Sequence, residues 1–363
     1  MTKIASEPPL FEADNLSVME AIDKAQTIAF APYIWEVTRI LKEKGLLACI
    51  EVSGREGRTI GSLAEQQHMS VYAVRVLLEA GLGIGLVYRK DDKYFLAKTG
   101  HIFLNHPMTV VNYDFMRNVC VAGAADMEAS LDKGRPEGLK HFGQWPTIYE
   151  GLSALPEQAQ KSWFAFDHFY SDNAFPEALE WVFEQPAKRI LDIGGNTGRW
   201  TLKCLAYDNA VHMGIVDLPG QLNMARENIA TAGYAGRVSY WEADMLREDD
   251  RLPEGFDVIW MSQFLDCFSE QQIIDILKKC FQVASRETRV IINETFWDKQ
   301  RFETSAFALQ MTSLYFTTMA NGNSQMYDSK VFKRLIEAAG FRVVKERNLV
   351  GIGHTLWELR KHL

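Results

Sequence analysis

The sequence predicts an α/β protein: a mainly helical N-terminal part is followed by a Rossmann-like domain with a doubly wound, mostly parallel sheet and an antiparallel terminal hairpin. Three observations predict this fold. From Lys188 onward, short apolar runs of strand type alternate with helical segments, as they do in parallel sheets. A glycine-rich turn follows the first of these runs, and the first hundred residues contain a helix–helix–hairpin pattern.

The expected strands of the C-terminal half are rich in β-branched and aromatic residues. They read "RILDIG", "VHMGIVD", "VSYWEAD", "FDVIWM" and "RVIINE". A last pair, "FRVVKERNLV" and "HTLWELRK", is joined through Gly351-Ile352-Gly353 and predicts the antiparallel hairpin. Because open α/β sheets bind ligands at the carboxyl ends of their strands, residues directly after these strands are the first candidates for a site.

The N-terminal hundred residues predict several helices and one hairpin. Residues 25–44 predict a long amphipathic helix with a kink at Pro32. Thr59 and Ser70 are each placed to cap a further helix, and residues 85–100 predict a hairpin. Two short helices followed by a hairpin form a winged-helix-like arrangement.

A winged helix often places its second helix in the major groove of DNA, so a DNA-binding regulator is an alternative for this part of the chain. Charge argues against that alternative. Residues 1–105 contain 12 Lys and Arg against 13 Asp and Glu, whereas a DNA-binding surface carries excess positive charge. The whole chain has a formal net charge of −8. We therefore expect no nucleic-acid partner.

We expect three parts in the chain: a winged-helix-like dimerisation domain over 1–105, a helical, substrate-covering segment over 106–185, and the catalytic Rossmann-like domain over 186–363. The middle segment is unusually rich in Trp, Phe, Tyr and His. Such side chains suit a planar aromatic ligand, which they contact by offset stacking. The candidates for a substrate pocket are His141, Trp163, Phe166, His168 and Tyr170.

The cysteine content and the hydropathy of the chain indicate in which cellular compartment we expect the protein. The five cysteines form no pairs at metal-ligand spacing, so neither a disulfide framework nor a structural zinc site is indicated. The N-terminal stretch "MTKIASEPPLFEAD" has no apolar core of a signal peptide, and no apolar run approaches the ~18 residues of a membrane span. We expect a cytoplasmic protein without a bound metal and without a membrane partner.

The turn "LDIGGNTGRW", residues 191–200, lets a ligand approach the backbone closely. Asn196 stands where the second glycine of a dinucleotide-binding G-x-G-x-x-G motif would fall, which weakens an NAD or FAD interpretation. Asp217 ends the next strand, 19 residues after the last glycine of the turn, the usual place for a carboxylate that binds ribose hydroxyls. Asp244 and Met245 end the third strand. Together these features indicate an adenosine site without a pyrophosphate.

The order D-x-G-G-x-T-G, D-L-P, A-D-M, then a strand and a capped helix, resembles the S-adenosylmethionine-dependent O-methyltransferases. The resemblance is to the plant caffeate and animal hydroxyindole type and to their bacterial relatives in pigment and antibiotic pathways. It covers nearly the whole chain, because that family also has a winged-helix-like dimerisation domain and a helical segment before the cofactor domain. It implies S-adenosylmethionine as cofactor, a homodimer and no metal.

The resemblance also implies roles for individual residues by motif match. The glycine turn would hold the methionine part of the cofactor, Asp217 the ribose, and Asp244 with Met245 the adenine. Ser262 occupies a position where the family often has Lys or Arg, and Tyr149 matches a cofactor-lining tyrosine loosely. The full implied set is Asp192, Gly194, Gly195, Asn196, Gly198, Asp217, Leu218, Asp244, Met245, Ser262 and Tyr149.

The sequence departs from the family at the catalytic base. Where the family reads His-Asp-Trp-Ser-Asp, residues 266–270 read Asp-Cys-Phe-Ser-Glu, so Asp266 stands at the position of the base. Of the two acids that commonly flank that histidine, Glu294 matches one, and the other falls near Met326, which cannot take the role. We take Asp266 and Glu294 as the candidate catalytic residues. Cys267 has no local histidine to activate its thiol and is expected to be structural.

An aspartate is a weak replacement for that histidine, because a phenol titrates near ~10, a free Asp near ~3.9 and a His near ~6.5. Three interpretations of Asp266 as a site residue follow. Burial raises its pKa and restores a base, the acceptor is already acidic and needs orientation only, or the base lies elsewhere at His141 or His168. As a structural alternative, Asp266 caps the helix that follows it.

The sequence thus predicts a methyltransferase that acts on the hydroxyl group of a small aromatic metabolite. Methyl transfer depends mainly on the positioning of donor and acceptor, and a base is needed only where the acceptor must lose a proton. Without the family's histidine, methylation of carbon or of a pre-ionised oxygen is an alternative. A catalytically silent S-adenosylmethionine-binding protein and a winged-helix regulator are alternatives from a different functional class.

Overall fold

The structure is a computed structural model that describes residues 10–362. Residues 1–9, which belong to the stretch where no signal peptide is expected, lie outside the described residues. The described chain divides into two compact units, residues 11–114 and residues 115–362, and the division falls at the end of α7 (Pro107–Phe115). Each unit has buried apolar clusters of its own.

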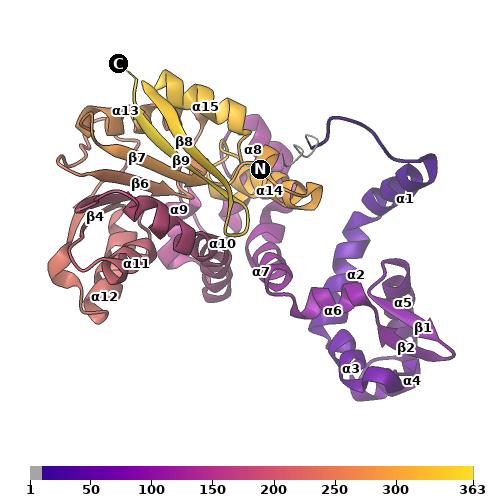
Figure 1. The fold of residues 1–363 in the computed structure, drawn as a ribbon. Helices are drawn as coiled ribbons and strands as arrows, with labels where there is room; N and C mark the ends of the chain where they lie inside the picture. The colour runs from indigo at the N-terminus through magenta and orange to yellow at the C-terminus, as the bar shows by residue number, and fades with distance from the viewer. Residues whose placement is uncertain (1–9, 363) are drawn as a thin grey trace, which may run out of the picture. The chain divides into compact units, whose positions relative to one another are not determined.

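The N-terminal unit contains the predicted helix–helix–hairpin. Thr59 accepts a hydrogen bond from the Ser62 amide, and Ser70 accepts one from the Ala73 amide, so both predicted N-caps are formed. Its helices are α1 (Val18–Ala29), α2 (Ala31–Glu43), α3 (Leu46–Ser53), α4 (Ile60–Gln66), α5 (Val71–Gly83) and α6 (Lys98–Asn105) (Figure 1). Its strands are β1 (Val87–Lys90) and β2 (Lys93–Leu96), which pair antiparallel.

The single kinked helix predicted over residues 25–44 is wrong. The structure has two helices, α1 and α2, which meet at Phe30. Pro32 lies in the first turn of α2, where its missing amide hydrogen costs no intrahelical hydrogen bond, so the proline begins a helix instead of bending one. No residue of α1 is buried, and Val18 is 76% exposed.

The first part of the C-terminal unit is mostly helical, as expected for the middle segment. The long helix α10 (Glu157–Phe183) has a buried C-terminal half, in which Ala174, Ala178 and Val182 pack against the sheet that follows. The other elements are α8 (Met127–Lys133), α9 (Ile148–Gly151), π-helical turns over Met116–Cys120 and Phe316–Ala320, and short 3-10 turns over Val121–Asp126, Glu137–His141 and Leu152–Ala154.

The predicted doubly wound sheet is confirmed. In the described residues it has seven strands in the order β5-β4-β3-β6-β7-β9-β8, with β3 to β7 parallel and β9 antiparallel to both β7 and β8. The strands are β3 (Arg189–Ile193), β4 (His212–Asp217), β5 (Val238–Glu242), β6 (Val258–Ser262), β7 (Arg289–Glu294), β8 (Phe341–Val350) and β9 (His354–Lys361). The chain leaves β3 toward β4 on one side and later adds β6 on the other, which opens a crevice at their carboxyl ends.

Helices cover both faces of this sheet (Figure 1), and the alternation of side chains along the strands decides which core each residue joins. Val258 and Trp260 pack with α10 and α11, whereas Ile259 and Met261 pack with α13 and α15. The bounds of these helices are α11 (Arg199–Tyr207), α12 (Pro219–Thr231), α13 (Glu270–Val283), α14 (Glu303–Tyr315) and α15 (Ser329–Ala338). No helix in the described part of the chain combines the length and the apolar character needed to cross a membrane.

A buried ion pair joins the sheet to the end of α10. Arg289 Nε donates to Glu358 Oε2 at 3.0 Å, and the side chains are 3% and 4% exposed. The two Nη groups of Arg289 donate to the carbonyls of Val182 and Trp181 at 2.6 and 3.1 Å. Arg360 also lies 3.0 Å from Glu358 Oε1, so both buried charges are satisfied.

We predict that Glu358→Ala lowers the free energy of unfolding by about 3–5 kcal/mol, because it leaves the Arg289 guanidinium buried without its carboxylate. The double variant Arg289→Leu with Glu358→Leu removes both charges and should lose less than Glu358→Ala alone. Urea unfolding followed by fluorescence measures both. As a control, Glu157→Gln breaks an exposed ion pair with Lys161 and should leave the transition unchanged. A Glu358→Ala variant as stable as that control would contradict the prediction.

Candidate active site

One continuous cavity of about 280 Å³ opens at the carboxyl ends of β3, β4, β5 and β6, entirely within the C-terminal unit. The strand ends form one wall and α10 with the neighbouring helical turns forms the other. Of the site residues predicted from the sequence, the cavity is lined by Tyr149, Trp163, Phe166, His168, Asp192, Gly194, Gly195, Asn196, Asp217, Leu218, Asp244, Met245, Ser262 and Asp266. It is not lined by His141, Tyr170, Gly198 or Glu294.

The glycine turn needs its glycines for packing as well as for access. Gly194 has φ +73°, and a Cβ there would lie 2.2 Å from Cδ2 of Phe264. Asn196 also has a positive φ, 49°, a conformation that costs free energy for a side chain other than glycine. Its amide donates to Asp217 Oδ2 at 2.8 Å, and its Oδ1 is buried without a hydrogen-bond partner among the described residues. Gly198 starts α11 behind the turn.

Acids at the next strand ends face the same cavity. Asp217 Oδ1 accepts a hydrogen bond from the Leu218 amide at 2.7 Å, and burial raises the pKa of Asp217 to about 6. Asp244 Oδ1 accepts one from the Leu246 amide at 2.9 Å, and Met245 is buried beside it. Each carboxylate oxygen can accept more than one hydrogen bond, so Asp217 and Asp244 retain capacity for a ligand.

Three further predicted residues surround this end of the cavity. Asp192 is 2% exposed and accepts a hydrogen bond from Thr201 Oγ1 at 2.8 Å, and burial raises its pKa to about 7. Ser262 Oγ accepts a hydrogen bond from Asn293 Nδ2 at 2.9 Å. The hydroxyl of Tyr149 is buried without a hydrogen-bond partner among residues 10–362.

Asp266 lies in the short 3-10 turn η7 (Leu265–Cys267) between β6 and α13, and it is 3% exposed. Burial raises its pKa to about 6, close to the ordinary value of a histidine. The Cys267 thiol donates to Asp266 Oδ1 at 3.5 Å, and burial raises the pKa of Cys267 well above its usual range. The cysteine is therefore a neutral thiol. Ser269, not Asp266, is the N-cap of α13 and forms the predicted capping box, so the capping alternative for Asp266 is wrong.

Glu294 supports the Asp266 loop from behind. It ends β7 and is 1% exposed. Its Oε1 accepts hydrogen bonds from the amides of Phe264 and Leu265 at 3.0 and 2.8 Å. Burial, followed by the nearby charge of Asp266, raises the pKa of Glu294 well above its usual range. Two carboxyls this close do not both ionise easily, so Glu294 holds the proton and Asp266 carries the charge.

The other end of the cavity is aromatic. The rings of Phe115 and Phe166 stack with their centroids 4.0 Å apart, and Phe115 also contacts Tyr315 edge-on at 4.9 Å. Trp163 Nε1 donates to the Tyr315 hydroxyl at 2.6 Å, which fixes the indole against the wall. Met326, at the position where the family's second acid would fall, is buried and lines this part of the cavity.

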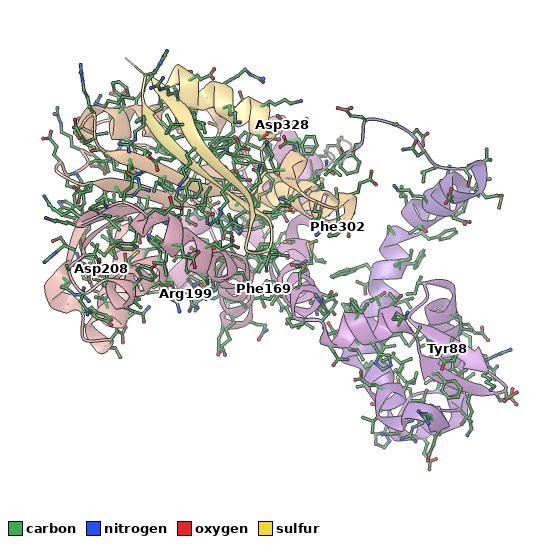
Figure 2. All side chains as sticks on the ribbon, viewed as in Figure 1. Tyr88, Phe169, Arg199, Asp208, Phe302 and Asp328 are labelled. Carbon is green, nitrogen blue, oxygen red and sulfur yellow. The ribbon has the colours of Figure 1, made fainter. Side chains whose placement is uncertain are left out.

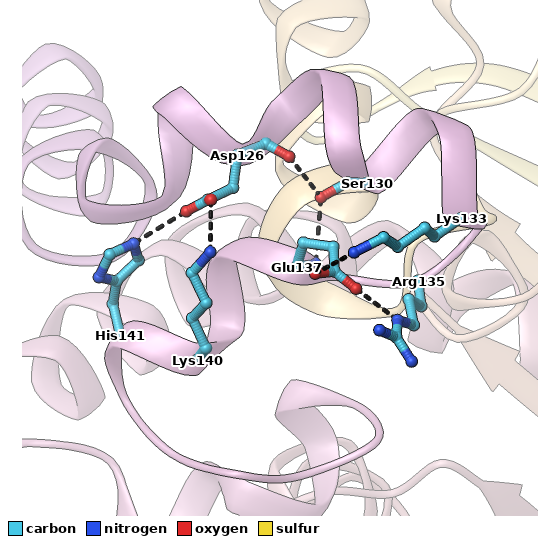
Figure 3. Close-up of polar contacts among 7 residues, drawn as sticks. All are labelled: Asp126, Ser130, Lys133, Arg135, Glu137, Lys140 and His141. Atoms are coloured by element: carbon cyan, nitrogen blue, oxygen red, sulfur yellow. Dashed lines mark hydrogen bonds and ion pairs between the residues drawn. The ribbon is translucent and has the colours of Figure 1, made fainter.

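The two histidines proposed as alternative bases differ in their placement. His141 does not reach the cavity, and its Nε2 pairs instead with Asp126 at 2.9 Å (Figure 3). His168 does line the cavity, but burial lowers its pKa to about 4, so it is a weaker base than Asp266. Tyr170 packs on the ring of Phe166 with centroids 5.0 Å apart and stays outside the lining.

Several polar residues of the lining were not predicted from the sequence, and three of them contact or face the predicted site residues. Asp167 on α10 accepts a hydrogen bond from Asn196 Nδ2 at 3.2 Å, and burial raises its pKa to about 7. Gln263 follows β6 with φ 45°, and its Oε1 is buried without a hydrogen-bond partner in the described chain. Asn321 Nδ2 donates to the carbonyl of Cys267. Only Asp167 has a signal in the sequence, as the lone acid in the run "WFAF-D-HFY".

The lining suits a ligand that is positively charged. It includes five half-buried or buried acids, Asp167, Asp192, Asp217, Asp244 and Asp266. Arg199 is the one Arg or Lys among the lining residues of the described chain, and it pairs with Asp172. S-adenosylmethionine carries a sulfonium and an ammonium group, so acids that lack a protein cation and acceptors such as Asn196 Oδ1 fit it. No cluster of His, Cys, Asp or Glu within residues 10–362 is arranged to hold a metal ion.

Comparisons with known proteins agree with this geometry. Residues 23–94 match the model of the Dimerisation2-like domain, and residues 174–342 match that of the O-methyltransferase domain. The chain is 22% identical to the L-tyrosine C(3)-methyltransferase of Streptomyces lavendulae over 294 residues, 80% of this chain and 79% of the relative. It is 24% identical to the demethylspheroidene O-methyltransferase of Cereibacter sphaeroides over 293 residues, 79% of this chain and 74% of the relative.

Solved structures show the same fold. The O-methyltransferase NcsB1 from neocarzinostatin biosynthesis, crystallised with S-adenosylmethionine and 2-hydroxy-5-methyl naphthoic acid, superposes with a TM-score of 0.66. The superposition covers 90% of this chain and 95% of that one at 17% sequence identity. A dimerisation-type domain, an O-methyltransferase domain and an acid-lined cavity at the switch point of the sheet thus occur in one chain. The chain therefore contains a Dimerisation2-like domain and an O-methyltransferase domain, and it is an S-adenosylmethionine-dependent methyltransferase.

Proposed function

We propose that this methyltransferase methylates a hydroxyl group of a small aromatic metabolite, with Asp266 as the general base. The observation that carries the proposal is the position of Asp266. It is the charged carboxylate of a buried acid pair, and it lines the same cavity as the aromatic cluster and the cofactor-type strand ends. Burial brings its pKa from the ordinary range of an aspartate to about 6, close to that of the family's histidine.

We propose the following division of the cavity for the cofactor. Asp217, which retains acceptor capacity on both oxygens, binds the ribose hydroxyls, and Asp244 with Met245 lies against the adenine. The glycine turn at Gly194 and Gly195 brings the backbone close to the methionine part. Asp192 lines the same cavity and accepts a hydrogen bond from Thr201, so we assign it to supporting the turn beside the cofactor.

In the proposed reaction, S-adenosylmethionine supplies an electrophilic methyl group on its sulfonium. The residues of this chain do the rest. The aromatic cluster of Phe115, Trp163, Phe166 and Tyr315 holds the ring of the acceptor by stacking. Asp266 accepts the proton of the acceptor hydroxyl, and protonated Glu294 fixes the loop that aims Asp266 by binding two of its amides. The buried surroundings exclude water from the reacting oxygen.

The lining also favours one kind of acceptor. Since Arg199 is committed to Asp172, no Arg or Lys of the described lining is free to neutralise a carboxylate on the acceptor. We therefore propose a phenol whose ring substituents are uncharged. This argues against the pre-ionised carboxylate among the acceptors considered from the sequence. Methylation of ring carbon is the second candidate, since the similar protein of Streptomyces lavendulae is named as a C(3)-methyltransferase of L-tyrosine.

We further propose that the chain is a homodimer whose interface includes α1. This helix buries no residue, and its exposed apolar side chains are Val18, Met19, Ile22 and Ile28. Such a face is costly to leave in water, and the Dimerisation2-like match begins within the same helix, at residue 23. The helical segment 106–185 covers the substrate in this proposal, because its residues supply much of the aromatic wall.

The dimer proposal predicts that Val18→Asp with Ile22→Asp halves the molar mass measured by light scattering at micromolar concentration. Charges at both positions have to be desolvated in an apolar interface. The control is Lys24→Asp, which changes the charge of the same exposed helix and should leave the mass unchanged. A double variant that keeps the mass of the parent protein would contradict the proposed interface, as would a parent protein of monomer mass.

The cofactor assignment predicts that Asp217→Asn weakens binding of S-adenosylhomocysteine at least tenfold in isothermal titration calorimetry. Hydrogen bonds to a charged acceptor contribute about 1.5–3 kcal/mol, and the amide replaces one acceptor oxygen by a donor. Asp249→Asn, at an exposed acid outside the lining, is the matched control. Equal affinities for the parent and Asp217→Asn would remove Asp217 from the cofactor site.

The base assignment predicts that Asp266→Asn lowers kcat on a neutral catechol by about 100-fold or more. The parent's kcat/KM should rise with pH through about 6 and then level off, because the base acts only when deprotonated, and Asp266→Asn should lose this dependence. Asp266→His should retain most of the activity, since a histidine titrates near ~6.5. Affinity for S-adenosylhomocysteine, measured in parallel, should stay within twofold for all variants.

Two comparisons complete this test. Cys267→Ser changes the neighbouring thiol and should keep both the activity and the pH profile. A catechol that bears a ring carboxylate should be methylated far more slowly than its neutral counterpart. If Asp266→Asn methylates the neutral catechol as fast as the parent, Asp266 is not the base. Preference for the carboxylated catechol would contradict the proposed acceptor class.

A further inference from the structure

The glycine turn is attached to α10 by polar contacts from three of its residues. Asn196 Nδ2 donates to Asp167 Oδ2 at 3.2 Å, and Arg199 Nε donates to Asp172 Oδ1 at 3.0 Å. Thr197 Oγ1 lies 3.5 Å from His168 Nε2. The helix segment before the sheet thus forms a wall of the cavity directly opposite the turn. Arg199, at the first position of α11, is seen in Figure 2.

Asp167 is the member of this set that faces the cavity without a charged hydrogen-bond partner. Its side chain is 22% exposed and lines the cavity, whereas Asp172 is already paired with Arg199. Within the described residues, Oδ1 of Asp167 makes no hydrogen bond, and Oδ2 accepts one, from the neutral amide of Asn196. The adjacent His168 is neutral. A carboxylate in such surroundings is stabilised by a ligand that brings a positive charge.

Asn196 bridges Asp167 and Asp217, the carboxylate proposed to bind the ribose. Its backbone amide donates to Asp217 Oδ2 at 2.8 Å, and its side chain donates to Asp167 Oδ2 at 3.2 Å. The two carboxylates therefore lie on either side of one residue of the turn. In S-adenosylmethionine the ribose is joined through its 5′ carbon to the sulfonium and the amino-acid chain. A ligand with its ribose at Asp217 brings the ammonium end of that chain toward a carboxylate beyond Asn196.

We propose that Asp167 is a cofactor-binding residue that receives the α-ammonium group of the methionine part of S-adenosylmethionine. The inference rests on the proposed cofactor site and extends it from the Rossmann-like strand ends to α10. Asp192 is not an equivalent candidate, because it is 2% exposed and held by Thr201. Asp192 also lines the cavity, but its Oδ2 already accepts the Thr201 hydroxyl, and the residue exposes far less surface than Asp167 does.

The test is calorimetric titration of the full-length parent, Asp167→Asn, Asp172→Asn and Asp217→Asn with two ligands. S-adenosylhomocysteine carries the ammonium group, and 5′-methylthioadenosine lacks the whole amino-acid part. We expect Asp167→Asn to bind S-adenosylhomocysteine at least tenfold more weakly and 5′-methylthioadenosine within twofold of the parent. Asp217→Asn should weaken both ligands, because both contain the ribose. Asp172→Asn, on the same helix, should weaken neither by more than about threefold.

Each remaining outcome has a definite meaning. If Asp167→Asn weakens both ligands equally, Asp167 only holds the glycine turn through Asn196, and the proposal is wrong. If it binds S-adenosylhomocysteine as tightly as the parent, the proposal is also wrong, while the proposed cofactor site stands. If the parent binds neither ligand, the cofactor site itself fails. Asp167→Glu, which keeps the charge, should bind S-adenosylhomocysteine more tightly than Asp167→Asn, and the reverse order would oppose a charge contact.

Discussion

The arrangement of the site depends on one buried carboxyl, that of Glu294. The loop after β6 leaves the sheet with a positive φ at Gln263, and its next two amides have no strand partner. Glu294 Oε1 accepts hydrogen bonds from both of them. The same group, kept protonated by burial and by its neighbour, leaves the negative charge on Asp266. Glu294, which does not line the cavity, therefore determines both the position and the charge of Asp266, the proposed base.

The fold, and the strand-end residues that line the cavity, could be predicted from sequence because their signals are local. Strand alternation, the glycine turn and the acids directly after β4 and β5 each lie within a few residues, and parallel strands bring their ends together. The break at Phe30 was missed because a proline in the first turn of a helix and a proline that bends a helix look alike in sequence. Figure 1 shows the helices that cover the sheet, whose existence the strand–helix alternation predicts.

The aromatic part of the cavity, where we propose that the methyl acceptor binds, could not be predicted to the same degree. Its residues come from segments that are distant in the sequence. Trp163 and Tyr315 are joined by a hydrogen bond across 152 positions of the chain, and Asn321 reaches the Cys267 carbonyl across 54. Neither pairing leaves a pattern in the sequence. His141 and Tyr170 belong to the same aromatic-rich stretch as Trp163, yet they contact other partners, Asp126 and Phe166. Composition indicated an aromatic wall, and only the packing decides which rings form it.

The long helix α10 combines two tasks along its length. Its C-terminal half is built of small and apolar residues, including Ala174, Ala178 and Val182, that sit directly on the sheet. Its N-terminal half presents Trp163, Phe166 and Asp167 to the cavity. Substitutions that alter acceptor choice therefore fall on turns of the helix that do not pack on the sheet. Substitutions on these turns can therefore produce an enzyme with a new acceptor while α10 stays packed on the sheet. A substitution in the half that packs on the sheet would instead shift every side chain of the helix.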